Sequence, residues 1–138
     1  MTRVFWDTNL FIYLLEGGPF ASRVRELRAR MLARHDHLFT SALTLGELLV
    51  KPHAAGPDAV RDHAAALQGA STILPFDAAA AFHYAALRAD RSIKPPDAIQ
   101  LACAASAEVD LFITNDDRLA GKNVPGVKFI ASLDKAFL

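Results

Sequence analysis

Short apolar segments alternate with longer helix-forming segments along almost the whole chain, and this alternation constrains the fold more than any other feature. Strands are expected at residues 3–6, 37–40, 72–74, 111–113 and 127–130. Helices are expected at residues 10–15, 23–34, 41–50, 58–68, 77–89, 95–107, 116–119 and 132–137. Strands that are apolar on both faces and separated by helices are typical of a parallel sheet buried between two helical layers. We therefore predict a three-layer α/β/α fold with a mostly parallel sheet of about five strands.

Two residues set expected helix boundaries. The helix at 41–50 should end near Pro52, because proline disfavours helical backbone at the residue before it. Ser22 should cap the helix at 23–34. The apolar face of that helix is expected to contain Val24, Leu27, Met31 and Leu32. These boundaries follow from local sequence alone.

The composition fits one globular domain over residues 1–138. Of the 138 residues 52% are hydrophobic and only seven each are Gly and Pro, so a sizeable core can be buried. Cys103 is the only cysteine, which excludes an internal disulfide and a cysteine-based zinc site and makes the cytoplasm the expected compartment. The apolar runs near the N-terminus are too short for a membrane span, so we expect no membrane association.

Four acidic residues stand at the edges of apolar elements: Asp7, Glu47, Asp97 and Asp116. Asp7 and the Asn115-Asp116 pair follow expected strands, so both should lie at the edge where open α/β sheets bind ligands. Glu47 and Asp97 come from helices, with Asp97 in a first turn, where the helix dipole favours an anion. We expect the fold to bring all four carboxylates to one rim.

Carboxylates gathered at one rim repel each other, by about 4 kcal/mol per close pair at an effective dielectric constant near 20. A bound cation would offset this repulsion. Ligand sets made only of oxygen select hard ions such as Mg²⁺ or Mn²⁺. A site of this kind suits phosphodiester hydrolysis, because the ion activates a bound water and neutralises charge on the leaving oxygen. One ion or two would serve this chemistry.

Each acid also has a purely structural interpretation. Asp7 alone is an ordinary helix cap, Asp97 an ordinary first-turn acid, and Asp116 a cap before the next helical turn. Glu47 is the most informative of the four, because it stands among leucines in a helix that we expect to be largely buried. Its structural alternative is a buried ion pair with Lys51 one turn later. The order and spacing of the four acids favour the metal site.

The acids stand in four motifs: Asp7-Thr8-Asn9, Thr44-Leu45-Gly46-Glu47, Pro96-Asp97-Ala98 followed by Leu101-Ala102, and Thr114-Asn115-Asp116. They resemble the four acidic motifs of the PIN domain, and the resemblance covers essentially the whole chain. Within that superfamily the chain is most similar to VapC-type toxins, the ribonuclease halves of prokaryotic type II toxin–antitoxin pairs. The resemblance implies Mg²⁺- or Mn²⁺-dependent endonucleolytic cleavage of RNA, a homodimer, and inhibition by a cognate antitoxin that covers the active site.

By this resemblance, the catalytic, metal-binding carboxylates are Asp7, Glu47, Asp97 and Asp116. Thr114 would orient a carboxylate or a water through its hydroxyl, and Asn9 and Asn115 would support the metal ligands from outside. The fourth acid of the family varies in placement, so Asp117 is an alternative to Asp116, which we favour. No histidine or lysine is required as a base, since the metal-bound water is the nucleophile.

Local charge matters because the fifteen basic and fifteen acidic residues cancel. One expected helix carries five arginines: Arg23, Arg25, Arg28, Arg30 and Arg34. In most proteins such a face is simply solvated. Our hypothesis is that Arg23, Arg25 and Arg28 contact RNA phosphates or the acidic side of an antitoxin.

Three other functions compete with that of a toxin nuclease. A phosphatase of the haloacid-dehalogenase type needs a second aspartate two residues after the first, where this chain has Asn9. A non-catalytic binding module would be expected to have lost an acid, whereas all four are present. A PIN nuclease that processes RNA without an antitoxin remains open, as do the RNA target and the antitoxin type.

Overall fold

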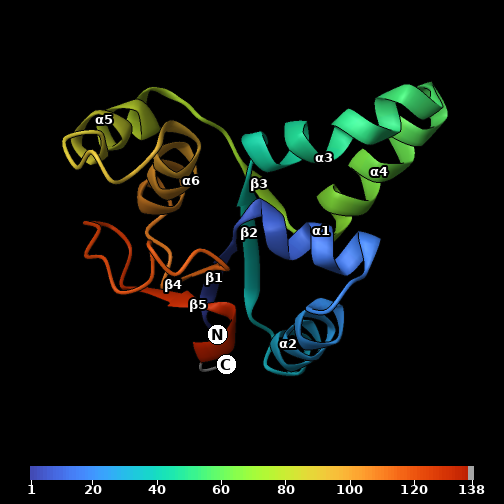
Figure 1. Ribbon diagram of the computed structural model, residues 1–138, viewed down its shortest axis with the longest axis horizontal. Helices are drawn as coiled ribbons and strands as arrows, with labels where there is room; N and C mark the ends of the chain where they lie inside the picture. The colour runs from blue at the N-terminus through green and yellow to red at the C-terminus, as the bar shows by residue number, and fades with distance from the viewer. Residues whose placement is uncertain (137–138) are drawn as a thin grey trace.

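A parallel five-stranded sheet forms the centre of the computed structural model, which describes residues 1–136 (Figure 1). Its strands are β1 Arg3–Trp6, β2 His37–Ser41, β3 Thr72–Leu74, β4 Leu111–Thr114 and β5 Phe129–Ser132. They lie in the order β3-β2-β1-β4-β5, and each neighbouring pair is parallel. The predicted class and strand number are confirmed.

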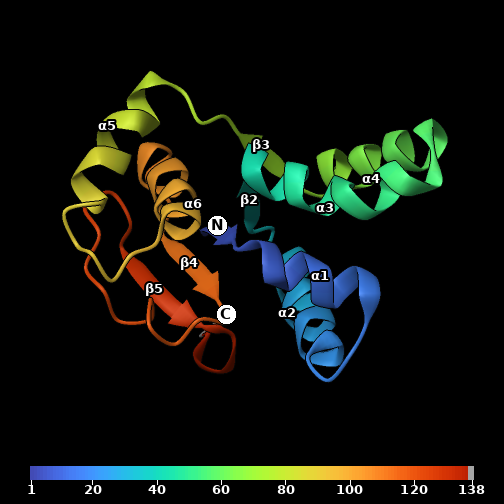
Figure 2. The ribbon, with the colours of Figure 1, turned by 45° about the horizontal axis from the view of Figure 1, so that its top comes forward.

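Helices cover both faces of this sheet (Figure 2). They are α1 Thr8–Glu16, α2 Ala21–Ala33, α3 Ala42–Ala55, α4 Pro57–Ala70, α5 Ala78–Leu87, α6 Pro95–Ser106 and a 3-10 helix at Leu133–Lys135. The pair α5 and α6 lies on one face, and α1 and α2 lie on the other. Helices α3 and α4 form a hairpin that projects from the edge of the molecule in both views (Figures 1 and 2).

The central strands are apolar on both faces, as a sheet between two helical layers requires. Val4 and Trp6 of β1 pack with α1 and α2, whereas Phe5 between them faces the layer of α5 and α6. The Phe5 ring stacks on Phe112 of β4, with 5.0 Å between ring centroids. Cys103 of α6 is buried in that same core and forms no disulfide. Burial on both sides agrees with the position of β1 at the centre of the sheet, between β2 and β4.

The expected end of the third helix near Pro52 is wrong. Helix α3 continues through Pro52 to Ala55, and the Pro52 side chain is buried. A proline inside a helix removes one backbone hydrogen bond and costs about 3 kcal/mol, a cost that packing of α3 against α4 offsets. The helix ends at Gly56, where φ of +116° is a conformation that favours glycine.

Several element boundaries also differ from those expected. Residues 117–121 form turns in place of a helix, because the Asp116 carboxylate accepts the Arg118 backbone N–H and competes with helical hydrogen bonding. Strand β5 begins two residues later than predicted, since its pairing with β4 sets Phe129 opposite Leu111. Helix α2 begins at Ala21 without a side-chain cap, and Leu32 is 58% exposed. The C-terminal helix is a short 3-10 turn, and residue 137 lies outside the described residues.

Within residues 1–136 there is no helix that is both long and apolar enough to cross a membrane.

Candidate functional site

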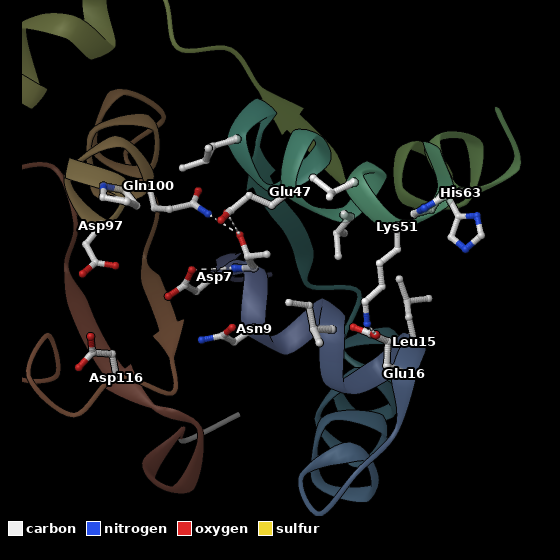
Figure 3. A pocket seen from close by; sticks show the side chains of 17 residues that line it. Asp7, Asn9, Leu15, Glu16, Glu47, Lys51, His63, Asp97, Gln100 and Asp116 are labelled. Atoms are coloured by element: carbon white, nitrogen blue, oxygen red, sulfur yellow. Dashed lines mark hydrogen bonds and ion pairs between the residues drawn. The ribbon is translucent and has the colours of Figure 1, made fainter. Parts of the chain in front are cut away.

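The four acids predicted from sequence line one cavity of about 570 Å³ at the carboxyl end of the strands. Asp7 lies between β1 and α1, Glu47 lies in α3, Asp97 in α6, and Asp116 in the loop after β4. In Figure 3 the side chains of Asp7, Asp97 and Asp116 point into the same space, with Glu47 above them. Parts of the chain far apart in sequence therefore place four carboxylates on one cavity wall.

Asp7 is the most buried of these acids, with 9% of its surface exposed. It caps helix α1: its Oδ1 accepts a hydrogen bond from the Thr8 backbone N–H at 2.7 Å. Its Oδ2 accepts another from the Thr114 hydroxyl at 2.9 Å. Burial raises the pKa of Asp7, and these two hydrogen bonds oppose part of that rise. A cation would stabilise this buried carboxylate further.

Thr114 links Asp7 to Asp116 through hydrogen bonds. Its hydroxyl oxygen accepts the Asp116 backbone N–H at 3.0 Å while its proton is donated to Asp7. The Asp116 carboxylate is held by a two-pronged interaction with Arg118, with Nε at 3.0 Å from Oδ1 and a terminal nitrogen at 2.7 Å from Oδ2. Hydrogen bonding from Arg118 holds the pKa of Asp116 below its usual value.

Asp97 faces the other acids from the first turn of α6. Burial raises the pKa of Asp97, and the negative charge of Asp116 raises it further. The charges of Asp97 and Glu47 in turn raise the pKa of Asp7. The four carboxylates thus interact electrostatically across the cavity.

Glu47 is exposed, so the expectation of a largely buried environment is wrong. The reason is that α3 belongs to the α3–α4 hairpin, which projects from the edge of the molecule (Figure 2). Glu47 lines the cavity from this helix. Lys51 forms its ion pair with Glu16 of α1, which removes the structural alternative of a Glu47–Lys51 pair. Glu47 instead accepts a hydrogen bond from the Thr8 hydroxyl at 2.8 Å.

Of the other residues predicted to support the metal site, some line the cavity and others do not. Asn9 lies on its wall (Figure 3). Asn115 points elsewhere and donates its amide to the Tyr13 hydroxyl at 2.9 Å. Asp117 is exposed and does not line the cavity, which favours Asp116 as the fourth acid.

The arginines of α2 do not line this cavity. Arg23 forms an ion pair with Asp134, and Arg28 donates to the Ala70 carbonyl at 3.3 Å. Arg25 is exposed. Contact of these residues with RNA or an antitoxin therefore remains a prediction about a surface away from the acids.

A buried polar network beneath the acids was missed by the sequence analysis. Gln100 of α6 is 2% exposed, and its amide group contacts the hydroxyls of Ser41, Thr8 and Thr44. The sequence contained one indication: Gln100 is the single amide in the otherwise apolar run from Ala98 to Ala105. Partners in other elements could not be deduced from it.

The donor set fits a hard divalent cation, since carboxylates are the most numerous potential metal ligands among the residues that line the cavity. Within residues 1–136, no three His, Cys, Asp or Glu side chains stand close enough together to form a complete metal centre. Mg²⁺ keeps several of its waters and commonly uses only one or two protein carboxylates. The arrangement therefore fits an ion bound partly through water.

The raised pKa of Asp7 predicts how the stability of the metal-free protein depends on pH. Because folding raises this pKa, the folded state binds a proton more tightly than the unfolded chain does. The contribution of Asp7 to the free energy of unfolding therefore falls as pH rises from the ordinary carboxyl pKa through the raised one. A difference of one pKa unit between the folded and unfolded states corresponds to about 1.4 kcal/mol of unfolding free energy.

Asp7→Asn removes this titration while keeping a side chain that can cap the helix. In EDTA, the unfolding free energy of the variant relative to the wild type should increase as pH rises above the ordinary carboxyl pKa of about 4. Urea unfolding at a series of pH values measures that difference. A difference that stays constant with pH would contradict burial as the cause of the raised pKa.

The fold and the site together define a class of protein: an α/β protein with an acidic cavity at the carboxyl edge of a parallel sheet. The model of the PIN domain family matches residues 4–124. The chain therefore belongs to the PIN domain family, a family of nucleases that use divalent metal ions.

Solved structures support the same assignment. The chain is 26% identical to a chain of a toxin–antitoxin complex from Klebsiella pneumoniae, with a TM-score of 0.67 and coverage of 91% of this chain and 95% of that one. It is also 26% identical to a chain of VapBC-5 from Mycobacterium tuberculosis, with a TM-score of 0.60 and coverage of 96% and 99%. A chain of VapBC2 from Rickettsia felis shares the fold at 17% identity, with a TM-score of 0.73 and coverage of 94% and 98%. The comparison with curated protein sequences found no match.

Proposed function

We propose that this chain is a Mg²⁺- or Mn²⁺-dependent endoribonuclease and the toxin of a type II toxin–antitoxin pair. The observation that carries the nuclease proposal is the convergence of four carboxylates from four separate elements on one cavity. Residues 1–138 would form a single nuclease domain, and a cytoplasmic location fits a substrate such as RNA.

In this proposal Asp7, Glu47, Asp97 and Asp116 would hold the metal, partly through bound water. A divalent ion held there would supply an activated water and charge neutralisation at the scissile phosphate. Asp7 is held in place by the Thr8 backbone and the Thr114 hydroxyl, so it presents its carboxylate in a fixed orientation. Asn9 on the cavity wall offers an amide that can donate to a phosphate oxygen or a water.

Arg118 has a distinct role in this mechanism. Its guanidinium pairs with Asp116, yet 63% of its side chain is exposed, so it can also reach a phosphate at the mouth of the cavity. Guanidinium groups bind phosphate oxygens with two parallel hydrogen bonds. Arg118 therefore places a positive charge beside the acidic site, where it would favour approach of an RNA backbone.

The toxin proposal is supported by similarity along nearly the full length of chains from toxin–antitoxin complexes. A cognate antitoxin protein is the corresponding partner, and the chain would form a homodimer. An RNA-processing nuclease without an antitoxin is the competing function. Co-purification of the chain with the product of a small adjacent gene would distinguish the two.

The experiment that tests the nuclease is incubation of the purified protein with a mixed structured RNA. Cleavage is expected with Mg²⁺ or Mn²⁺, loss of cleavage with EDTA, and recovery when metal is added in excess. Cleavage that persists unchanged in EDTA would refute the metal-dependent mechanism. Absence of both cleavage and Mn²⁺ binding would favour a non-catalytic binding module.

A further inference from the structure

The buried amide of Gln100 joins three elements that carry the acids. Gln100 lies one turn after Asp97 in α6. Its Nε2 donates to the Thr8 hydroxyl at 2.9 Å in α1 and to the Thr44 hydroxyl at 2.8 Å in α3. Its Oε1 accepts from Ser41, which caps α3. Each polar atom of this amide is therefore satisfied by a hydroxyl from another part of the fold.

The chemistry of the groups fixes the direction of these hydrogen bonds. An amide nitrogen can only donate, so the Thr8 and Thr44 oxygens accept from Gln100. The single proton of Thr8 is then available for Glu47, whose Oε1 lies 2.8 Å away. Because an ionised carboxylate only accepts, Thr8 must donate in that contact. The 3.0 Å contact between Thr44 and Thr8 then uses the Thr44 proton.

The opposite orientation of the Gln100 amide would be incompatible with these hydrogen-bond directions. Its carbonyl oxygen would then face Thr8 and Thr44 and would compete with Glu47 for the Thr8 proton. Ser41 already accepts the Thr44 backbone N–H at 3.4 Å as the cap of α3, which leaves its own proton for the Gln100 oxygen. The orientation present in the structure is thus the one that leaves the Thr8 hydroxyl proton free for Glu47.

We propose that Gln100 is a positioning residue that acts through Thr8 to hold the exposed Glu47 carboxylate in its metal-binding orientation. Glu47 is on an open cavity wall, and a long exposed side chain loses rotational freedom when it binds an ion. A hydrogen bond from an anchored hydroxyl restricts that freedom before binding. The inference rests on the proposed function, because it assigns Glu47 to the metal.

The test measures Mn²⁺ affinity by isothermal titration calorimetry on the full-length chain, alongside thermal unfolding. Gln100→Met keeps the volume but removes the amide, and it should weaken Mn²⁺ binding about tenfold, as loss of a group supporting a metal ligand does. Thr8→Val should weaken it to a similar extent, and Thr8→Ser, which restores the hydroxyl, should return it to near the wild-type affinity. Cys103→Ala is the control for altered packing in α6, with unchanged affinity expected.

A double-mutant cycle separates a positioning role from general disturbance of the fold. In a Glu47→Gln background, Gln100→Met should cause no further loss of Mn²⁺ affinity, because the group through which it acts is already altered. An equal loss in both backgrounds would overturn the inference. If Gln100→Met does not fold, the comparison of Thr8→Val with Thr8→Ser tests the inference. Equal Mn²⁺ affinities of these two variants would overturn the inference.

Failure of this inference differs from failure of the proposed function. If the wild type binds Mn²⁺ and Glu47→Gln weakens binding while Gln100→Met does not, the metal centre stands and the role of Gln100 is refuted. If the wild type binds no Mn²⁺, the metal centre itself is refuted, and the positioning role is refuted with it.

Discussion

Asp7→Asn is expected to reduce RNA cleavage about a thousandfold without unfolding the protein. The change removes the negative charge from the most buried of the four acids, which is 9% exposed. Metal ions stabilise transition-state charge by several kcal/mol, and a loss of about 4 kcal/mol corresponds to about three orders of magnitude in rate. Initial rates of cleavage of a fluorescent RNA at saturating Mn²⁺, together with circular dichroism, measure both effects.

The structure offers a matched control for this change. Asp77 also caps a helix, accepting the Ala80 backbone N–H at 3.0 Å, but it does not line the cavity. Asp77→Asn therefore repeats the chemical change at a cap without touching the acids, and its cleavage rate should stay within about twofold of the wild type. If the two variants lost activity equally, capping rather than metal binding would explain the role of Asp7.

Asp116→Asn should reduce cleavage about a hundredfold, or about 3 kcal/mol in transition-state stabilisation, whereas Asp117→Asn should leave it nearly unchanged. Asp116 lines the cavity and is tied to Asp7 through Thr114. Asp117 is its neighbour but is exposed and does not line the cavity. The smaller effect than at Asp7 reflects the greater exposure of Asp116, at 22% of its side chain.

Cleavage rates and Mn²⁺ titrations of the two variants decide the fourth acid directly. The Asp116→Asn protein also loses its ion pair with Arg118, but an exposed pair contributes only about 0–1 kcal/mol to stability. Its melting temperature should therefore change little. A large loss of activity in Asp117→Asn with full activity in Asp116→Asn would reverse our assignment.

The local features of the fold were predictable because they depend on neighbouring residues. The alternation of apolar and helix-forming segments predicted the parallel sheet, since a strand buried on both faces must be apolar throughout. Asp7 could be placed at the end of the first strand, because the apolar run stops there. The position of Asp97 in a first turn followed from the two prolines that open α6.

Prediction failed where packing between distant elements opposed a local preference. Pro52 alone favours a helix end, yet α3 continues past it because the helix packs along α4. The leucines around Glu47 suggested burial, whereas Glu47 is exposed and lines the cavity, in a hairpin that projects from the edge of the molecule. In both cases the deciding contacts come from residues that a short sequence window does not include.

The sequence by itself therefore determined the fold class, the strand positions to within a few residues, and the four candidate acids. Tertiary structure alone decided the strand order, the exposure of Glu47, and the hydrogen bonds beneath the cavity. Thr114 and Asp7 are 107 residues apart, and Gln100 and Thr8 are 92 apart, yet each pair forms a buried hydrogen bond. Hydrophobicity and backbone propensity act over a few residues, whereas a buried polar group takes its partner from whichever element the completed core places beside it.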